Sequence, residues 1–256
     1  MERRKTGMDE IAVSVIIPVH NAEDFIEDTI LSVKSQDFTD WEIVLVDDCS
    51  TDRSREIIER FEDEKIHLIV HSKGRGAAAA RNTGLSEARG RYITFLDADD
   101  LWDPQKLSLQ IDFMAEKHAS FSFTGYEFAG FDGVGVDKIV QVPERLNYRQ
   151  ALKNTTIFTS TVMFDTTRIP KEMICMPDVP SEDTATWWKI LRSGYTAYGY
   201  NRALTLYRRS EGTLSSNKFT AIQRVWNLYR NVENLNLIYS AYCFCFYAVH
   251  AVWRRL

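Results

Sequence analysis

Four short apolar runs mark the first part of this chain, and each is followed by a segment with helical spacing of apolar residues. The runs are continuous and rich in Val, Ile and Leu, a pattern typical of parallel strands that are buried on both faces. They lie at residues 13–19, 42–46, 66–70 and 91–96. Strand and helix therefore alternate four times, which predicts a doubly wound, mostly parallel α/β sheet flanked by helices.

Polar residues between these runs predict where the helices begin. We expect Asn21 to cap a helix that continues to about residue 36, and Ser50 or Thr51 to begin the next one. A Gly/Ala-rich turn that begins at residues 74–76 leads into a third helix, which continues through residue 88.

The alternation ends at about residue 119. Strands are expected at residues 120–129 and 159–164, a short helix after Asn147, and a longer helix over residues 182–191. These elements are mixed rather than alternating, so the second half predicts an α+β extension of the same sheet.

The last stretch of the chain is helical in pattern and unusually apolar. Residues 235–252 hold many Tyr and Phe and no ionisable acid or base except His250, and Arg254 and Arg255 follow. A membrane-spanning helix needs about 20 apolar residues, so this one is short for that purpose. It predicts an amphipathic appendage that lies in a membrane surface, or a helix that packs on the domain or on a second copy of the chain.

The composition of the chain indicates which partners it can bind and in which compartment it lies. With 256 residues, 45% of them hydrophobic, the chain can bury a full core, and its net charge of −5 argues against nucleic acid as a partner. The N-terminus is charged and has no apolar signal region, so we expect a cytoplasmic protein. The cysteines have the spacing of neither a zinc site nor a disulfide framework, which favours a reducing compartment. They are Cys49, Cys175, Cys243 and Cys245.

The acidic cluster Asp97, Asp99 and Asp100 directly follows the fourth strand. Ligands of open α/β sheets collect at the carboxyl ends of the strands. Carboxylates this close repel one another unless a cation lies between them, and a divalent cation that carries a diphosphate would serve. The alternative is that one acid only caps the next helix, a role that Asp103 already fills.

The ends of the first two strands also carry polar residues. Asp47 and Asp48 close the second strand, where a carboxylate can accept the imide N–H of a uracil or a ribose hydroxyl. Pro18, His20 and Asn21 close the first strand and could wrap a nucleoside through their backbone, or form only a turn. An acidic pair is also typical of receiver domains, but there it follows the first strand.

Arginines on two loops could balance a diphosphate. Arg75 and Arg81 lie in the Gly/Ala-rich segment, which is not a P-loop. Alternatively, Arg81 only pairs with a nearby aspartate. Arg208 and Arg209 follow another expected strand, and their polar loop could close over a bound diphosphate as a lid.

The acids Glu182 and Asp183 begin the helix predicted over residues 182–191. They could be a general base and its partner, placed to deprotonate an acceptor hydroxyl. Acids at a helix N-terminus are also favoured simply by the helix dipole.

Taken together, residues 12–216 resemble the inverting family 2 glycosyltransferases, which have a GT-A fold. Any one of the motifs is weak, but their order and the acids at strand ends make the set specific. The matching strings are residues 15–21, 46–52, 80–84, 95–100, 182–183 and 207–208.

The resemblance implies a nucleotide-diphosphate-sugar donor, most often UDP-linked, and a Mn or Mg cation. Asp48 resembles the acid that binds the base. Asp97, Ala98 and Asp99 resemble the D-x-D motif, which makes Asp97 and Ala98 nucleotide-binding residues and Asp97 and Asp99 metal ligands, Asp99 the direct one. Asp183 resembles the catalytic base, with Glu182 beside it.

The resemblance also predicts an organisation and a set of partners. Residues 12–118 would bind the nucleotide, residues 119–216 the acceptor, and residues 217–256 would form the appendage. We expect a glycan or lipid-linked acceptor in surface polysaccharide synthesis, at the cytoplasmic face of the membrane, with a homodimer as a further possibility. Ser210 stands where many relatives have a His.

Two other functions fit less of the sequence. A nucleotidyltransferase would carry a Gly-rich loop with Arg or Lys after the first strand, and residues 20–23 are not such a loop. A non-catalytic sensor or scaffold for nucleotide sugars would not need the intact Asp97, Asp99 and Asp183.

Overall fold

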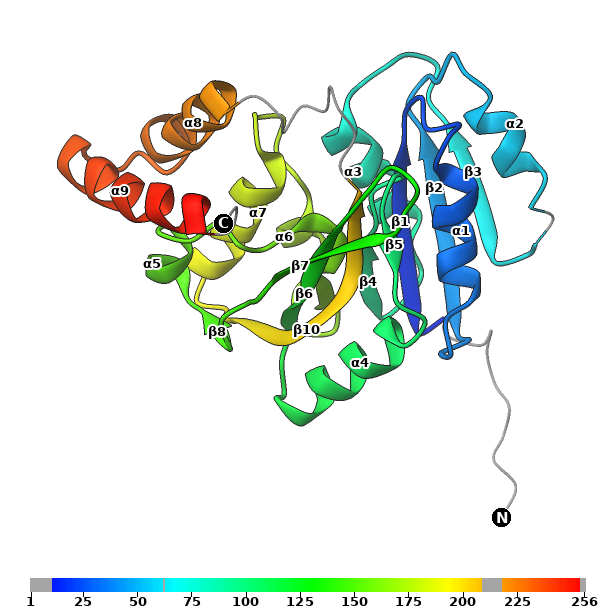
Figure 1. Ribbon diagram of the computed structural model, residues 1–256, viewed down its shortest axis with the longest axis horizontal. Helices are drawn as coiled ribbons and strands as arrows, with labels where there is room; N and C mark the ends of the chain where they lie inside the picture. The colour runs from blue at the N-terminus through cyan, green and yellow to red at the C-terminus, as the bar shows by residue number, and fades with distance from the viewer. Residues whose placement is uncertain (1–10, 62, 209–217, 254–256) are drawn as a thin grey trace.

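One ten-stranded mixed sheet organises the chain (Figure 1). The computed structural model describes residues 11–61, 63–208 and 218–253. Along the sheet the strands are β3 (Ile66–Val70), β2 (Trp41–Asp47), β1 (Val13–Val19), β4 (Tyr92–Phe95), β9 (Met163–Asp165), β6 (Phe121–Ala129), β10 (Ala197–Arg208) and β5 (Leu101–Trp102). Off this path, β7 (Gly135–Val140) pairs with β6, and β8 (Arg145–Leu146) pairs with β10.

The direction of the strands divides the sheet into two parts. The strands β3, β2, β1 and β4 run parallel, as their continuous apolar runs predict. Beyond them β9 runs antiparallel to both β4 and β6, while β6 and β10 are again parallel. The doubly wound first half and the mixed extension are both confirmed.

Helices cover both faces of the sheet. The helices α1 (Ile26–Lys34), α2 (Ser54–Glu59) and α4 (Lys106–Glu116) pack on the face to which β1 contributes Val13, Val15 and Ile17. Ile16 points to the other face, because successive side chains of a strand alternate. There the core includes residues of α3 (Ala77–Glu87), α5 (Tyr148–Ala151), α6 (Lys171–Ile174) and α7 (Glu182–Arg192).

Three helices begin later than predicted, and one of them is α4, whose N-cap is Gln105 and not Asp103. Asn21 does not cap α1, which starts five residues on; Asn21 has a positive φ of 50° and accepts a hydrogen bond from the Thr51 amide instead. The next helix does not begin at Ser50 or Thr51, because the Asp52 carboxylate accepts from the amide of Ser54, where α2 starts.

The predicted strand over residues 159–164 is only partly correct. Its first half is a 3₁₀ turn, Thr159–Thr161, and the strand β9 begins at Met163. The capping role of Asn147 is confirmed, since its side chain accepts from the Gln150 amide and the Gln150 side chain accepts in return from the Asn147 amide.

The appendage consists of α8 (Lys218–Asn227), a π-helical turn (Leu228–Val232) and α9 (Leu237–Trp253). Tyr229 stacks on Trp188 of α7 at 5.3 Å between ring centroids, and Cys243 of α9 is fully buried in the same core. The hypothesis of packing on the domain is therefore correct for one face of α9. Among the residues described, no helix has the length and apolar character needed to cross a bilayer.

The outward face of α9 is apolar. Ile238, Tyr242, Phe246 and Val249 recur at helical spacing and are exposed, Ile238 by 85%. Lys153 lies beside them, 4.6 Å from the centroid of the Tyr242 ring.

Candidate active site

A cleft of about 680 Å³ opens where β1, β2 and β4 end. This is the sheet edge at which open α/β proteins bind their ligands. Most of the residues predicted to bind nucleotide or metal line it. They are Pro18, His20, Asn21, Asp48, Arg81, Asp97, Ala98 and Asp99.

Asp48 anchors the Gly-rich loop that forms one wall of the cleft. Its carboxylate accepts hydrogen bonds from the backbone amides of Arg75 and Gly76 and from the ring of His71, at 2.7 to 3.0 Å. Burial raises the pKa of Asp48, but these donors outweigh burial and leave the pKa below its ordinary value. The carboxylate is therefore charged and already well supplied with donors.

The side chain of Asp47 points away from the cleft that Asp48 lines. Its buried carboxylate pairs with Arg55 of α2 at 3.0 Å and does not line the cleft. Neighbouring residues at a strand end point to opposite sides, so only one of the two acids can face a given cavity. The structure thus separates two residues that the sequence groups together.

The acids that follow β4 form a crowded cluster. Burial and the charge of Asp97 raise the pKa of Asp99 to about 6, and burial together with both neighbours raises the pKa of Asp100 well above its ordinary value. Asp100 is fully buried and accepts from the Ser160 hydroxyl at 2.5 Å and from the Arg208 amide at 3.2 Å. Asp97 and Asp99 are the two that face the cleft.

Arg81 connects this cluster to the acids of α7. Its guanidinium donates to Asp97 at 2.6 Å and to Glu182 at 2.8 Å, and it is nearly buried. Burial lowers the pKa of Arg81, but the charges of its acidic neighbours outweigh burial and keep the guanidinium protonated. The hypothesis that Arg81 pairs with a nearby aspartate is confirmed.

The two acids of α7 lie where that helix starts. Burial and Asp183 raise the pKa of Glu182, against the opposing charge of Arg81. Asp183 accepts from the hydroxyl of Thr159, at 3.1 Å, and from the amide of Thr184. Sequence reasoning missed Thr159 and Ser160, because a three-residue 3₁₀ turn has no sequence pattern that separates it from a strand.

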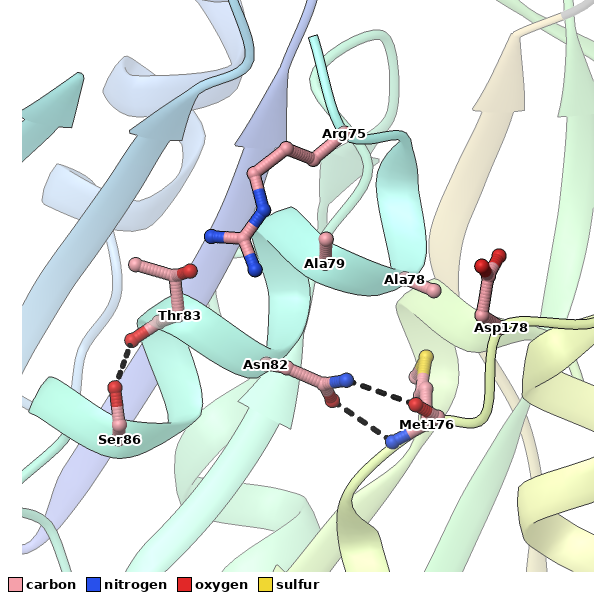
Figure 2. Close-up of a pocket in the computed structure, with 8 residues that line it drawn as sticks. All are labelled: Arg75, Ala78, Ala79, Asn82, Thr83, Ser86, Met176 and Asp178. Atoms are coloured by element: carbon pink, nitrogen blue, oxygen red, sulfur yellow. Dashed lines mark hydrogen bonds between the residues drawn. The ribbon is translucent and has the colours of Figure 1, made fainter. Parts of the chain in front are cut away.

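The other arginines that were predicted to bind a diphosphate do not share one environment. Arg208 is buried and donates to Asp28 of α1 at 2.6 Å, with its guanidinium over the ring of Phe25. Arg209 and Ser210 lie outside the described residues. The side chain of Arg75 extends along α3, beside a second depression of about 430 Å³ that Asp178 also lines (Figure 2).

Within the described residues, no three His, Cys, Asp or Glu side chains converge as a ready-made metal site. Asp97 and Asp99 nevertheless supply carboxylate oxygens, the ligands that Mg and Mn prefer. Burial first, and then the charge of Asp97, raises the pKa of Asp99, and a cation bound between the two carboxylates would offset both effects. The residues present therefore fit a divalent ion that binds together with a phosphate-bearing ligand.

The same fold is found in a solved glycosyltransferase structure. The mannosyltransferase PcManGT from Pyrobaculum calidifontis, solved in complex with GDP-Man and Mn²⁺, is similar with a TM-score of 0.66 over 96% of this chain and 77% of that chain, at 19% identity. The sheet and its flanking helices are those of a GT-A protein.

The chain belongs to the family described as Glycosyl transferase family 2, whose model matches residues 14–167. It is 46% identical to TuaG of Bacillus subtilis, which is named for teichuronic acid biosynthesis, over 95% of this chain and 97% of TuaG. It is 38% identical to WfgD of Escherichia coli over 89% of each chain. WfgD is named as a UDP-Glc:alpha-D-GlcNAc-diphosphoundecaprenol beta-1,3-glucosyltransferase.

Proposed function

We propose that this protein transfers a hexosyl or N-acetylhexosaminyl group from a UDP-sugar to a hydroxyl of a lipid-linked glycan, with inversion, in the synthesis of a cell-surface polysaccharide. One observation carries the proposal: acids from three distant parts of the chain gather at one sheet edge, and Arg81 joins two of these groups directly. The names of TuaG and WfgD support the choice of donor and acceptor.

The cleft would hold the donor in a fixed order along the sheet edge. Pro18, His20, Asn21 and the loop that Asp48 anchors would surround the uridine, and Asp97, Ala98 and Arg81 would lie toward the diphosphate. We assign this nucleotide-binding role to residues 12–118 and acceptor binding to residues 119–216.

Asp183 would remove the proton of the acceptor hydroxyl. The acceptor oxygen then attacks the anomeric carbon, and the bond to the diphosphate breaks with its electron pair going to UDP, so a single displacement inverts that carbon. The hydrogen bond from Thr159 orients the carboxylate of Asp183. The hydrogen bond from Arg81 fixes the position of the Glu182 carboxylate beside Asp183.

Asp99, together with Asp97, would hold a Mn or Mg ion. Such an ion, when bound, neutralises negative charge on a diphosphate leaving group. The backbone amide of Arg208 donates a hydrogen bond to the Asp100 carboxylate, and Arg208 would contribute positive charge to the same region.

Replacing Asp183 with Asn tests the proposal. Loss of a general base typically slows a reaction by about 100-fold to 10,000-fold, so we expect transfer from UDP-glucose or UDP-N-acetylglucosamine to a lipid-linked N-acetylglucosamine diphosphate to fall by that factor. UDP affinity, measured by calorimetry with manganese, should stay within about twofold. Asp178→Asn, the same substitution on an exposed residue of the preceding segment, is the control.

The result separates an enzyme from a sensor. If the unmodified protein binds UDP but neither transfers nor hydrolyses any UDP-sugar, the chain is a nucleotide-sugar-binding scaffold. If Asp183→Asn turns over at the normal rate, the assignment of the base is wrong.

We further propose that the outward face of α9 rests on the cytoplasmic surface of the membrane. The exposed stripe of Ile238, Tyr242, Phe246 and Val249 contains aromatic and aliphatic side chains only, a composition that suits the boundary between head groups and acyl chains. The ammonium of Lys153 bonds to the Tyr242 hydroxyl at 3.1 Å, beside this stripe, where an anionic lipid head group could pair with it.

Flotation with vesicles of phosphatidylglycerol and phosphatidylethanolamine tests this placement. The double variant Ile238→Ser, Val249→Ser removes exposed apolar area without touching the inner face of α9, so the fold should persist and flotation should fall. Ile139→Ser, a comparably exposed residue on β7, is the control. Undiminished flotation of the double variant, or a dimer that the variant dissociates, would contradict the membrane assignment.

A further inference from the structure

Asn82 on α3 holds both backbone polar groups of one residue in the segment that leads to α7. Its side-chain amide donates to the carbonyl of Met176 at 2.8 Å, and its carbonyl oxygen accepts from the amide of Met176 at 2.8 Å (Figure 2). The two residues are 94 apart in the chain. The contact therefore joins two parts of the protein that local structure would leave independent.

The segment that Asn82 holds has no regular structure of its own. Residues 175–181 connect α6 to α7, and their backbone groups need partners from elsewhere. The segment ends at Ser181, whose φ of 60° lies in the left-handed region, and Glu182 and Asp183 follow at once. A sharp turn of this kind sets the direction in which α7 starts, and so the position of both acids.

The helix that carries Asn82 is fixed to the sheet. A Cβ atom on Gly84 would lie 2.5 Å from the Ile16 side chain of β1, so α3 and β1 pack too closely here to admit a side chain on residue 84. Ala80 is fully buried against Val44 and Val46 of β2. Any group that α3 holds is thereby placed relative to the strands whose ends form the cleft.

We propose that Asn82 is a positioning residue for the transfer reaction. By fixing Met176 it sets the distance between Asp183 and a donor held at Asp97 and Asp99, without itself contacting either substrate. The inference rests on the proposed function for its catalytic consequence, whereas the mechanical part, a clamp on residues 175–181, stands on the geometry alone.

The variant Asn82→Ala should fold, because Asn82 and Met176 line the depression of about 430 Å³ from which water can reach the freed backbone groups. Misplacement of a catalytic group by about 1 Å can cost about 100-fold, so we expect kcat to fall by about 10-fold to 100-fold. The KM for donor and the affinity for UDP should stay within about twofold. Asn82→Asp keeps the acceptor for the Met176 amide but turns the donor into a second acceptor that faces the Met176 carbonyl, so its kcat should fall at least as far as that of Asn82→Ala.

Ser86→Ala is the matched control. Ser86 lies one turn further along α3 and lines the same depression, but its hydroxyl donates to the carbonyl of Thr83 and does not hold the segment. Its kcat and stability should equal those of the unmodified protein. An Asn82→Ala enzyme with normal kcat overturns the inference, and so does one that loses UDP binding and thermal stability in parallel with kcat, since that is a general structural defect.

Hydrogen exchange measured by mass spectrometry supplies a readout that does not need activity. Loss of two neutral hydrogen bonds should speed exchange in residues 174–181 by about 10-fold to 100-fold while peptides of β1 and β2 stay unchanged. If the unmodified protein transfers no sugar but exchange increases in Asn82→Ala, the proposed function fails and the clamp stands. If exchange does not change, the clamp itself is refuted.

Discussion

Lys106 should make the stability of this protein increase with pH in a range where most proteins change little. Its side chain is fully buried, its ammonium nitrogen lies 2.8 Å from the Gln110 side-chain oxygen, and no carboxylate within the described residues pairs with it. Burial lowers the pKa of Lys106 to about 7. The replacement Lys106→Met, which keeps the shape and removes the amine, exposes this effect.

The pKa values of Lys106 in the folded and unfolded states determine whether stability rises or falls with pH. In the unfolded chain the lysine keeps its proton up to about pH 10.4, whereas in the folded protein it loses the proton above about pH 7. The unfolded state therefore binds more protons between these values, and the free energy of unfolding rises with pH there. Between pH 7 and pH 9 the gain is about 2 kcal/mol. The Trp102 ring, 3.9 Å from the ammonium, favours the charged form and moves part of this rise to higher pH.

Urea unfolding at pH 7, 8 and 9, followed by tryptophan fluorescence, measures the effect. The free energy of the unmodified protein minus that of Lys106→Met should increase by about 2 kcal/mol across this range. The variant also loses the hydrogen bond to Gln110, which lowers its stability by the same amount at every pH. This constant offset does not affect the change in the difference between pH 7 and pH 9. Lys117→Met, at the surface end of the same helix, should show no such increase. A difference that is flat in pH would mean that Lys106 stays charged in the fold, and would refute the reasoning.

Three further predictions concern the cleft and α3. Gly84→Ala should destabilise the protein by about 1–3 kcal/mol, seen as a lower melting temperature, because the added methyl group meets Ile16; an unchanged melting temperature would contradict the close packing. Arg81→Lys should lower transfer more than about 10-fold with the fold retained, since Asp97 and Glu182 are bound by two separate nitrogens of the guanidinium and the single nitrogen of an ammonium cannot reproduce this geometry. Asp99→Asn should abolish the strengthening of UDP binding by manganese in calorimetry, whereas Asp112→Asn on α4 should not.

The strands could be predicted well from the sequence because of where they lie. The bounds of β1 and β3 agree with the prediction to the residue. For β1 the reason is burial on both faces, which requires a mostly apolar run, whereas β3 lies at the edge of the sheet and is only half-buried. The two-residue strand β5 could not be predicted, since it exists only through its pairing with β10. The predicted start of α1 was wrong for a similar reason. Asn21 is a good capping residue, but its side-chain oxygen accepts from the Thr51 amide, a partner that only the tertiary structure supplies.

Within the candidate site, position along the strand was predictable and orientation was not. Acids at strand ends had to lie at the carboxyl edge, but the sequence could not say that Asp48 would face the cleft and Asp47 would face Arg55. Partners that arrive from distant segments were also invisible, such as His71 on Asp48 and Ser160 on Asp100.

The five residues 80–84 illustrate why a short motif can be specific to a fold. Ala80 packs on β2, and Gly84 allows contact with β1. Between them, Arg81 bonds to Asp97 and Glu182, and Thr83 bonds to His71, which holds Asp48.

With Asn82 on the Met176 backbone, the residues of this helical turn differ in their main contacts, although Arg81 also approaches the sulfur of Met176. A substitution at any one of them should disturb one connection and leave the others. The expected defects accordingly differ: stability for Gly84, charge balance for Arg81, and the placement of α7 for Asn82. If all three variants instead showed the same defect, the turn would act as a single packing unit and the separate roles derived from its contacts would be wrong.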